Sequence, residues 1–290
     1  MNERGNMKII FLGVSGALSA KYNSNMLIEG YGLDENSKDK HFAMLFDCGE
    51  DIMHSLASAG RKPEELDAVY ISHLHADHCY GLSWLAYYTY FITKKKLTLF
   101  LHETMVSDIW SMLRPSLEKC DRQDRLMTLN DYFDVKLYKK DTRFNVGGMQ
   151  FYPVKQKHVE TPFGDIDSYG LRGYRCGDWC GYQDVGEEHI HHRLDRWRFF
   201  ISSDSKKMAI PNTNEYGALF PEYYYDYLFC DCDVMNLSGV HPNYNDLKKY
   251  DADTKSRMWL YHYHDLGDDM PDAVADGFAG FVKEGQVFEI

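Results

Sequence analysis

The sequence predicts an α/β protein built as a four-layer αβ/βα sandwich, with helices on the outer sides of two facing sheets. Strands and helices alternate through two halves of the chain, and each half opens with several strand-like segments. In such a sandwich the loops at one edge of the paired sheets carry the ligands. No repeat, low-complexity tract or linker interrupts the pattern, so we expect residues 1–290 to form one domain with a short insertion at about 172–197.

Apolar, β-branched segments bounded by turn residues indicate the strands of the first half. Residues 50–59 are expected to form a helix that ends at Gly60, and residues 82–94 an aromatic-rich helix. A second long helix is expected at 103–119, where Pro115 should kink or split it. The strands of this half are expected at 7–14, 25–31, 41–46, 68–71 and 97–101.

The second half has a pattern of strands and hairpins. Residues 133–159 include the turn signal Gly147-Gly148, and short apolar strands are expected at 197–201, 227–231 and 257–262.

Composition and charge restrict the possible partners. The net charge of −12 argues against a long nucleic-acid ligand, which usually requires a basic stripe. There is no run of eighteen apolar residues and no apolar signal segment after Met1, so we expect a cytoplasmic protein without a membrane span. Seven cysteines, an odd number, favour reduced thiols over a disulfide framework.

The segment from His73 to His78 is the most informative in the chain. His73, His75, Asp77 and His78 place four potential metal ligands within six residues, directly after the expected strand at 68–71. Three imidazoles and a carboxylate suit zinc, manganese or iron. We therefore expect a metal site at the end of this strand.

This segment resembles the H-x-H-x-D-H signature of the metallo-β-lactamase-fold hydrolases, and the resemblance extends from about residue 7 to residue 290. The opening at 11–16 and 21–25 is similar to the F-L-G-T-G…R-N-x-S segment of tRNase Z-like proteins, although the arginine and the final serine are absent. Residues 47–50 are similar to the D-C-G-E turn of the same proteins.

The resemblance implies three further metal ligands. His158 follows an expected strand at 150–154 and matches the family histidine before the next strand. Asp204 matches the bridging aspartate of a strand-then-G-D-T segment, with Ser203 in place of the glycine and Ser205 in place of the threonine. His262 matches the histidine of an L-T-H-F/Y-S ending, and His264 is the alternative two residues later.

The implied centre holds two divalent metal ions, with zinc favoured and manganese or iron as alternatives. His73, His75 and His158 would bind one ion, Asp77, His78 and His262 the other, and Asp204 would bridge them. Two such ions lower the pKa of a shared water and neutralise phosphoryl oxygens. Asp77 is also expected to orient the resulting hydroxide.

The proton for the leaving group is less clearly placed. If the strands align, Cys230 replaces the histidine of the family's H-E-A-T segment and Asp231 takes its glutamate position. The general acid could then be His241, in a segment that resembles a later G-H-S-T turn, or His264.

The expected function is hydrolysis of a small nucleotide phosphodiester, with a cyclic nucleotide favoured. The sequence is similar to the anti-Pycsar group of phosphodiesterases. Its members are thought to act as homodimers, so the resemblance implies a homodimer by analogy. The alternative enzyme functions are RNA 3′-end processing and hydrolysis of a thioester, lactone or β-lactam. Another alternative is a binding module that has lost turnover, because Cys230 stands where the family has a histidine.

A second, structural metal site is a weaker interpretation. Cys176 and Cys180 are followed by His189, His191 and His192, but their spacing matches no strong zinc pattern. An exposed insertion is the favoured interpretation of this stretch.

Overall fold

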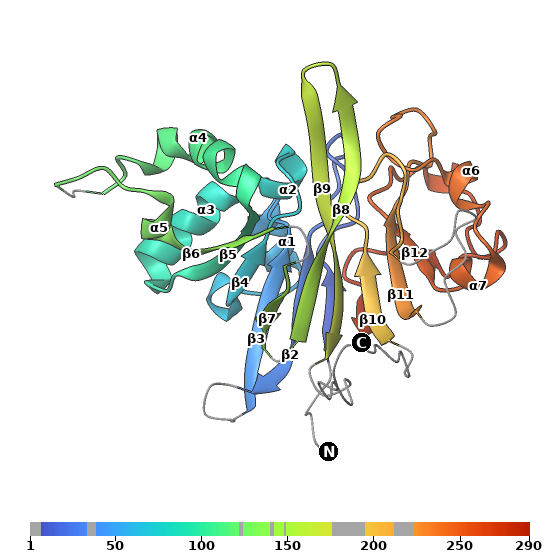
Figure 1. Cartoon of the computed structure of the whole chain (residues 1–290), viewed down its shortest axis with the longest axis horizontal. Coiled ribbons are helices and arrows are strands. Elements are labelled where there is room, and N and C mark those ends of the chain that lie inside the picture. Colours follow the sequence, from blue (N-terminus) through green and yellow to red (C-terminus); the bar gives the residue numbers. More distant parts are fainter. Residues whose placement is uncertain are drawn as a thin grey trace, which may run out of the picture.

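Two seven-stranded mixed sheets pack face to face, and helices cover the outer side of each sheet (Figure 1). The computed structural model describes residues 7–33, 39–121, 124–139, 142–147, 149–175, 195–211 and 223–290. The arrangement confirms the predicted four-layer αβ/βα sandwich. Among the described residues, no helix is long and apolar enough to cross a membrane.

The first sheet has the strand order β14-β1-β2-β3-β4-β5-β6. Neighbours from β14 to β3 are antiparallel, and those from β3 to β6 are parallel. The pairing of β14 with β1, which was not predicted, brings residues near the C-terminus into the N-terminal sheet. The strands are β1 (Lys8–Phe11), β2 (Met26–Leu33), β3 (Asp39–Phe46), β4 (Ala68–Tyr70), β5 (Leu97–His102), β6 (Phe133–Tyr138) and β14 (Val287–Glu289).

The second sheet has the order β13-β12-β11-β10-β9-β8-β7, with antiparallel pairs from β7 to β10 and parallel pairs from β10 to β13. Its longest strands, β8 and β9, form a hairpin that projects beyond the body of the molecule (Figure 1). The strands are β7 (Phe144–Val146), β8 (Met149–Thr161), β9 (Gly164–Arg175), β10 (Asp195–Ile201), β11 (Tyr223–Asp231), β12 (Met258–Tyr261) and β13 (Gly280–Phe281).

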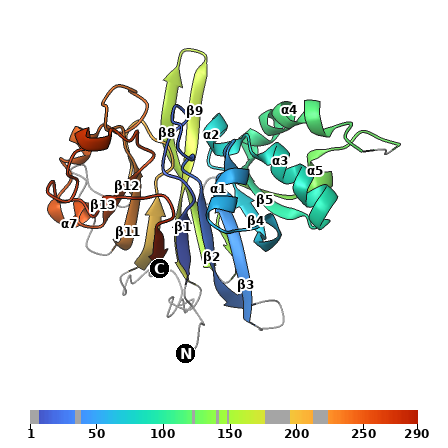
Figure 2. The ribbon, with the colours of Figure 1, turned by 180° about the vertical axis from the view of Figure 1, so that it is seen from behind.

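Helices flank the two sheets on opposite sides, as the view from behind also shows (Figure 2). On the side of the first sheet lie α1 (Ile52–Ser58), α2 (Ala76–Cys79), α3 (Leu82–Tyr87), α4 (Val106–Leu117) and α5 (Leu129–Tyr132). The same side carries the short 3₁₀ helices η1 (Pro63–Glu65) and η3 (Glu103–Met105) and the π-helix η2 (Tyr88–Thr93), which continues directly from α3. On the side of the second sheet lie α6 (Tyr244–Leu247), α7 (Ala252–Lys255) and η4 (Gly267–Asp269).

Two expectations about secondary structure need correction. The prediction that Pro115 could split its helix is wrong, because α4 continues through Pro115 to Leu117. The strand β9 was not predicted, because it contains several glycines. Two of them permit close packing: a Cβ on Gly170 would lie 2.4 Å from the Ile201 carbonyl oxygen, and one on Gly173 would lie 2.7 Å from the Phe199 ring.

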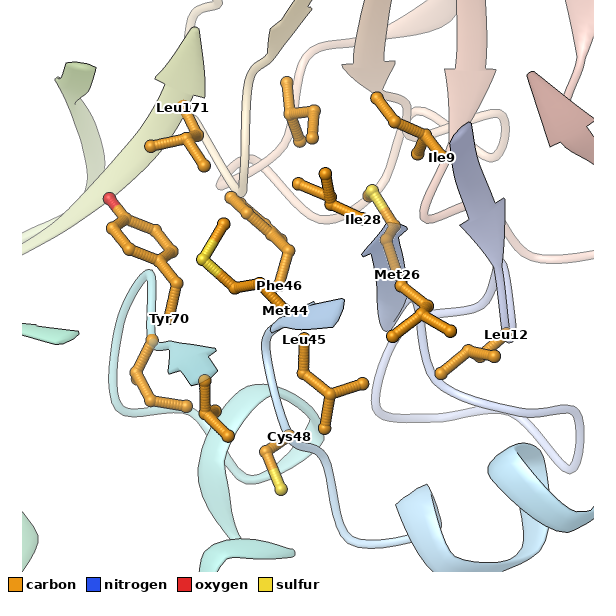
Figure 3. Packing of buried hydrophobic residues seen from close by; sticks show 14 of the residues in the cluster. Ile9, Leu12, Met26, Ile28, Met44, Leu45, Phe46, Cys48, Tyr70 and Leu171 are labelled. Atoms are coloured by element: carbon orange, nitrogen blue, oxygen red, sulfur yellow. The ribbon is translucent and has the colours of Figure 1, made fainter. Parts of the chain in front are cut away.

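The main core lies between the sheets, where Phe46 and Tyr70 of the first sheet meet Leu171 of the second (Figure 3). Leu45 points to the opposite side of β3, as the alternation of a strand requires (Figure 3). Each such side chain is fully buried and contributes about 1.5–3 kcal/mol to stability. This core fixes the strand ends that carry the polar cluster described next.

The weaker metal-site interpretation falls outside the described residues. Cys176, Cys180, His189, His191 and His192 all lie within 176–194. Most of the predicted insertion at about 172–197 lies there too, although β9 and β10 occupy its two ends.

Candidate metal centre

Strands from both sheets end at one edge and bring the predicted ligands together. His73 and His75 follow β4, and Asp77 and His78 lie in the short helix α2 that comes next. The other three come from the second sheet. Asp204 follows β10, His262 follows β12, and His158 lies within β8.

Left-handed backbone turns redirect the chain where these strands end. Asp47 after β3 has φ +67°, Ser203 before Asp204 has φ +55°, and His262 after β12 has φ +59°. Such angles are uncommon for residues other than glycine and cluster at functional sites. Because His262 ends its strand in this way, simple alternation no longer places His264 on the same face.

A β-bulge positions His158. The register passes from Lys157 opposite Asp167 to Val159 opposite Ile166, so His158 is the extra residue. The expectation that His158 follows a strand ending at Val154 is therefore wrong, because β8 continues to Thr161. The bulge turns the His158 ring toward His75, and its Nε2 lies 3.1 Å from His75 Nδ1.

The first cluster consists of His73, His75, His158 and Asp204. His75 Nδ1 lies 3.1 Å from His73 Nε2, and Asp204 Oδ2 lies 3.6 Å from His73 Nε2 and 3.7 Å from His158 Nε2. His75 therefore presents its Nδ1 atom, whereas His73 and His158 present Nε2. Three imidazole nitrogens and a carboxylate oxygen form a donor set of the kind that binds zinc.

The second cluster consists of Asp77, His78, His262 and the same Asp204. Asp77 Oδ2 lies 3.3 Å from His78 Nε2 and 3.1 Å from His262 Nε2. The two carboxylate oxygens of Asp204 divide between these histidines, with Oδ2 3.2 Å from His78 Nε2 and Oδ1 3.4 Å from His262 Nε2. Asp204 is thus shared by both clusters.

A layer of buried partners orients the histidines. His78 Nδ1 lies 2.7 Å from Asp47 Oδ2, and Asp47 also accepts hydrogen bonds from the backbone N–H and the hydroxyl of Ser72. His158 Nδ1 donates to the Val240 carbonyl at 3.0 Å. These contacts fix which ring nitrogen faces the cluster. From the sequence, Asp47 was predicted only as part of the turn at 47–50, although a carboxylate directly after a strand could have indicated its role.

Burial and charge set the protonation of the cluster. Burial lowers the pKa of His158 to about 4 and that of His73 well below its usual value. Burial alone would also lower the pKa of His78, but three carboxylates outweigh it and hold the pKa well above its usual range. Those carboxylates belong to Asp204, Asp77 and Asp47.

The residues present fit divalent cations. The buried atoms His78 Nε2 and Asp204 Oδ1 have no hydrogen-bond partner in the described part of the chain, although both face the cluster. Four carboxylates are also almost fully buried around it, and they are Asp47, Asp77, Asp204 and Asp231. Buried charges are normally paired or bound to metals, and two divalent cations would balance these four.

A third group adjoins the two clusters and shares Asp204 with them. His241 Nδ1 lies 3.2 Å from Asp231 Oδ2 and 3.9 Å from Asp204 Oδ2. Burial would lower the pKa of His241, but Asp204 and Asp231 raise it to about 9. The structure thus brings His241 to the cluster. His264 belongs to none of the three groups, and its Nε2 donates to the Leu18 carbonyl at 3.3 Å.

A cavity of about 690 Å³ opens onto the cluster. Its lining includes His75, Asp77, His158 and Asp204 together with His241, His262 and His264, and apolar residues from two loops. Pockets of this size commonly hold small molecules.

Comparison with known proteins assigns the family. The model of the family "Anti-Pycsar protein Apyc1" matches residues 7–288. The chain is 28% identical to the anti-Pycsar protein Apyc1 of Bacillus phage 010DV004, over 98% of this chain and 99% of that protein. It is 27% identical to the anti-Pycsar protein Apyc1 of Paenibacillus harenae, over 90% of this chain and 92% of that protein.

A solved structure shows the same fold. The metallo-β-lactamase fold protein YhfI from Bacillus subtilis aligns with a TM-score of 0.64 at 18% identity, covering 98% of this chain and 100% of YhfI. Because the family model spans nearly the whole sequence and the fold agrees, the chain belongs to the anti-Pycsar protein Apyc1 family and is a hydrolase of the metallo-β-lactamase fold.

Proposed function

We propose that this protein hydrolyses the phosphodiester of a small cyclic nucleotide with the help of two divalent cations. The observation that carries the proposal is the pair of four-residue clusters joined through Asp204, which opens onto a cavity of about 690 Å³. The net charge of −12 and the membership of the anti-Pycsar family support a small nucleotide over a long nucleic acid.

In this proposal His73, His75 and His158 would hold one cation, Asp77, His78 and His262 would hold the other, and Asp204, which belongs to both clusters, would contribute to both. When bound, such a pair lowers the pKa of a shared water and neutralises charge on the phosphoryl oxygens. Asp77 has a second role, because its carboxylate lies beside the cavity and can orient that water.

We further propose His241 as the general acid that protonates the leaving oxygen. Its Nδ1 is held by Asp231, which leaves Nε2 available to donate a proton, and His241 lines the cavity. Asp231 is itself fixed by the hydroxyls of Ser202 and Ser205, each 3.0 Å from Oδ1. His264 is the alternative acid, but its ring is engaged by the Leu18 carbonyl.

The identity of the metal, the oligomeric state and the cellular location are part of the same proposal. The donor set favours zinc, with manganese or iron as substitutes. We also propose a homodimer and a cytoplasmic location. Elemental analysis of the purified protein and light scattering test the first two, and fractionation of expressing cells tests the third.

The test of function is a hydrolysis screen of the metal-loaded protein. The substrates are 3′,5′-cyclic mononucleotides, cyclic dinucleotides, a tRNA precursor, a thioester and a lactone, each with and without chelator. Chelator-sensitive cleavage of a cyclic nucleotide is the expected result. Cleavage of the precursor alone would establish RNA processing instead, and hydrolysis confined to thioesters or lactones would establish an acyl hydrolase.

A further inference from the structure

Two apolar loops form the mouth of the cavity. The Leu18 loop (residues 16–21) begins beside the cluster, because a Cβ on Gly16 would lie 2.7 Å from the His262 ring. The Asp233 loop (residues 233–241) ends at His241. Both loops contribute cavity lining through Leu18, Met235 and Leu237. Leu18 and Leu237 are 87% and 76% exposed, so both leave apolar surface uncovered at the cavity that they line.

The Asp233 loop is held rigidly. The Asp233 carboxylate accepts hydrogen bonds from four successive backbone N–H groups, at 2.9 Å for residues 235 and 236, 2.8 Å for residue 237 and 2.7 Å for residue 238. This wall of the cavity is therefore fixed in place before any ligand arrives.

The Leu18 loop is fastened to the segment that follows His262. The Tyr263 N–H donates to the Val14 carbonyl at 3.2 Å, and His264 Nε2 donates to the Leu18 carbonyl at 3.3 Å. At the far end of the loop, Lys21 forms an ion pair with Asp265. We call the contacts of Leu18 with His264 and of Lys21 with Asp265 the latch.

We propose that Leu18 is a substrate-contacting residue that packs on the base of the nucleotide substrate, and that the latch positions it there. The inference rests on the proposed function, because a phosphodiester bound at the two proposed cations would extend its base into the cavity that Leu18 lines. Apolar contact suits the face of a base, which needs no hydrogen bond. His264 and Asp265 are then positioning residues.

The first test is steady-state kinetics of Leu18→Ala with 3′,5′-cyclic AMP. KM should rise about fivefold, as expected for the loss of one apolar contact, with kcat within about twofold of wild type. A base-free ribose 3′,5′-cyclic phosphate should show no such rise. Leu126→Ala is the matched control, because Leu126 is also an exposed leucine, at 56%, and does not line the cavity.

The second test concerns the latch. Lys21→Asp and Asp265→Lys should each raise KM about two- to fivefold, and the double exchange should restore it, since an exposed ion pair contributes little to folding. If wild type cleaves cyclic AMP and Leu18→Ala leaves KM unchanged, or raises it equally for the base-free compound, this inference is overturned alone. A wild-type protein that cleaves no cyclic nucleotide overturns the proposed function together with it.

Discussion

His78 and Asp47 form a buried pair in which His78 Nδ1 lies 2.7 Å from Asp47 Oδ2. This contact leaves His78 Nε2 facing Asp77 and Asp204, at 3.3 and 3.2 Å. Asp47 is fully buried at a left-handed backbone position, so its place depends on the turn after β3. It thereby orients a proposed ligand without lying in either cluster itself.

Asp47→Asn should weaken metal binding about 10- to 100-fold, because the amide cannot support a cation-binding histidine as a carboxylate does. Chelator competition measures this change. Asp134→Asn is the control, since Asp134 is an exposed carboxylate paired with Lys136 on β6. Equal metal affinity in both variants would remove Asp47 from the proposed centre.

Asp77→Ala should reduce the metal content to about half and abolish turnover, because one of the two proposed cations loses its only unshared carboxylate. Elemental analysis of the dialysed protein gives the stoichiometry, and the hydrolysis assay gives the rate. A variant that keeps full activity would refute the role proposed for Asp77.

His241→Gln should lower kcat about 10²- to 10⁴-fold while metal content stays unchanged. The loss should be smaller for a p-nitrophenyl ester, whose leaving group needs little help from an acid. Adding Asp231→Asn to His241→Gln should cause little further loss, because Asp231 acts through the His241 ring. If His264→Gln gives the larger loss in kcat instead, His264 is the acid.

Metal binding should release protons at neutral pH. The pKa of His78 is raised in the metal-free protein, so both ring nitrogens carry protons there, and a cation at Nε2 must displace one. Apparent affinity should consequently rise with pH by about tenfold per unit for each proton displaced. Calorimetry in buffers of different ionisation enthalpy counts the protons. A titration that releases none would contradict the protonated state inferred for His78.

Ser203→Gly should stabilise the protein by ~1 kcal/mol, because Ser203 adopts φ +55°, which costs a residue with a Cβ more than it costs glycine. The Ser203 hydroxyl is also buried without a hydrogen-bond partner in the described structure. Thermal unfolding of the metal-free protein measures the change. Ser205→Gly is the control and should destabilise, since Ser205 Oγ donates to Asp231.

The sequence predicted the layers of the fold and the identity of the proposed ligands. It did not predict the local backbone geometry that places those residues. Alternating strands and helices predicted the sandwich, and the spacing from His73 to His78 indicated the first proposed ligands. The bulge at His158 depends on how β8 pairs with β9, which is a tertiary property. The choice between His241 and His264 similarly depends on tertiary contacts. His241 is held by Asp231, and His264 contacts the Leu18 carbonyl, which is far away in the sequence.

Elements with weak local signals were missed for the same reason. The strand β9 contains glycines that are needed for close packing against β10, so its propensity is low although its pairing is extensive. The strand β14 has only three residues and exists because β1 offers it a partner. Neither could be identified without knowing what packs beside it.

His75 has a spectroscopic consequence because, among the five histidines of the first and second clusters, it alone presents Nδ1, whereas His73, His158, His78 and His262 present Nε2. In a nitrogen-15 NMR spectrum of the loaded protein, its ring should carry the proton on the opposite nitrogen from the other four. That signal would identify the ion beside His73 and His158 separately from its neighbour. Filling of the two positions could then be followed independently during a titration.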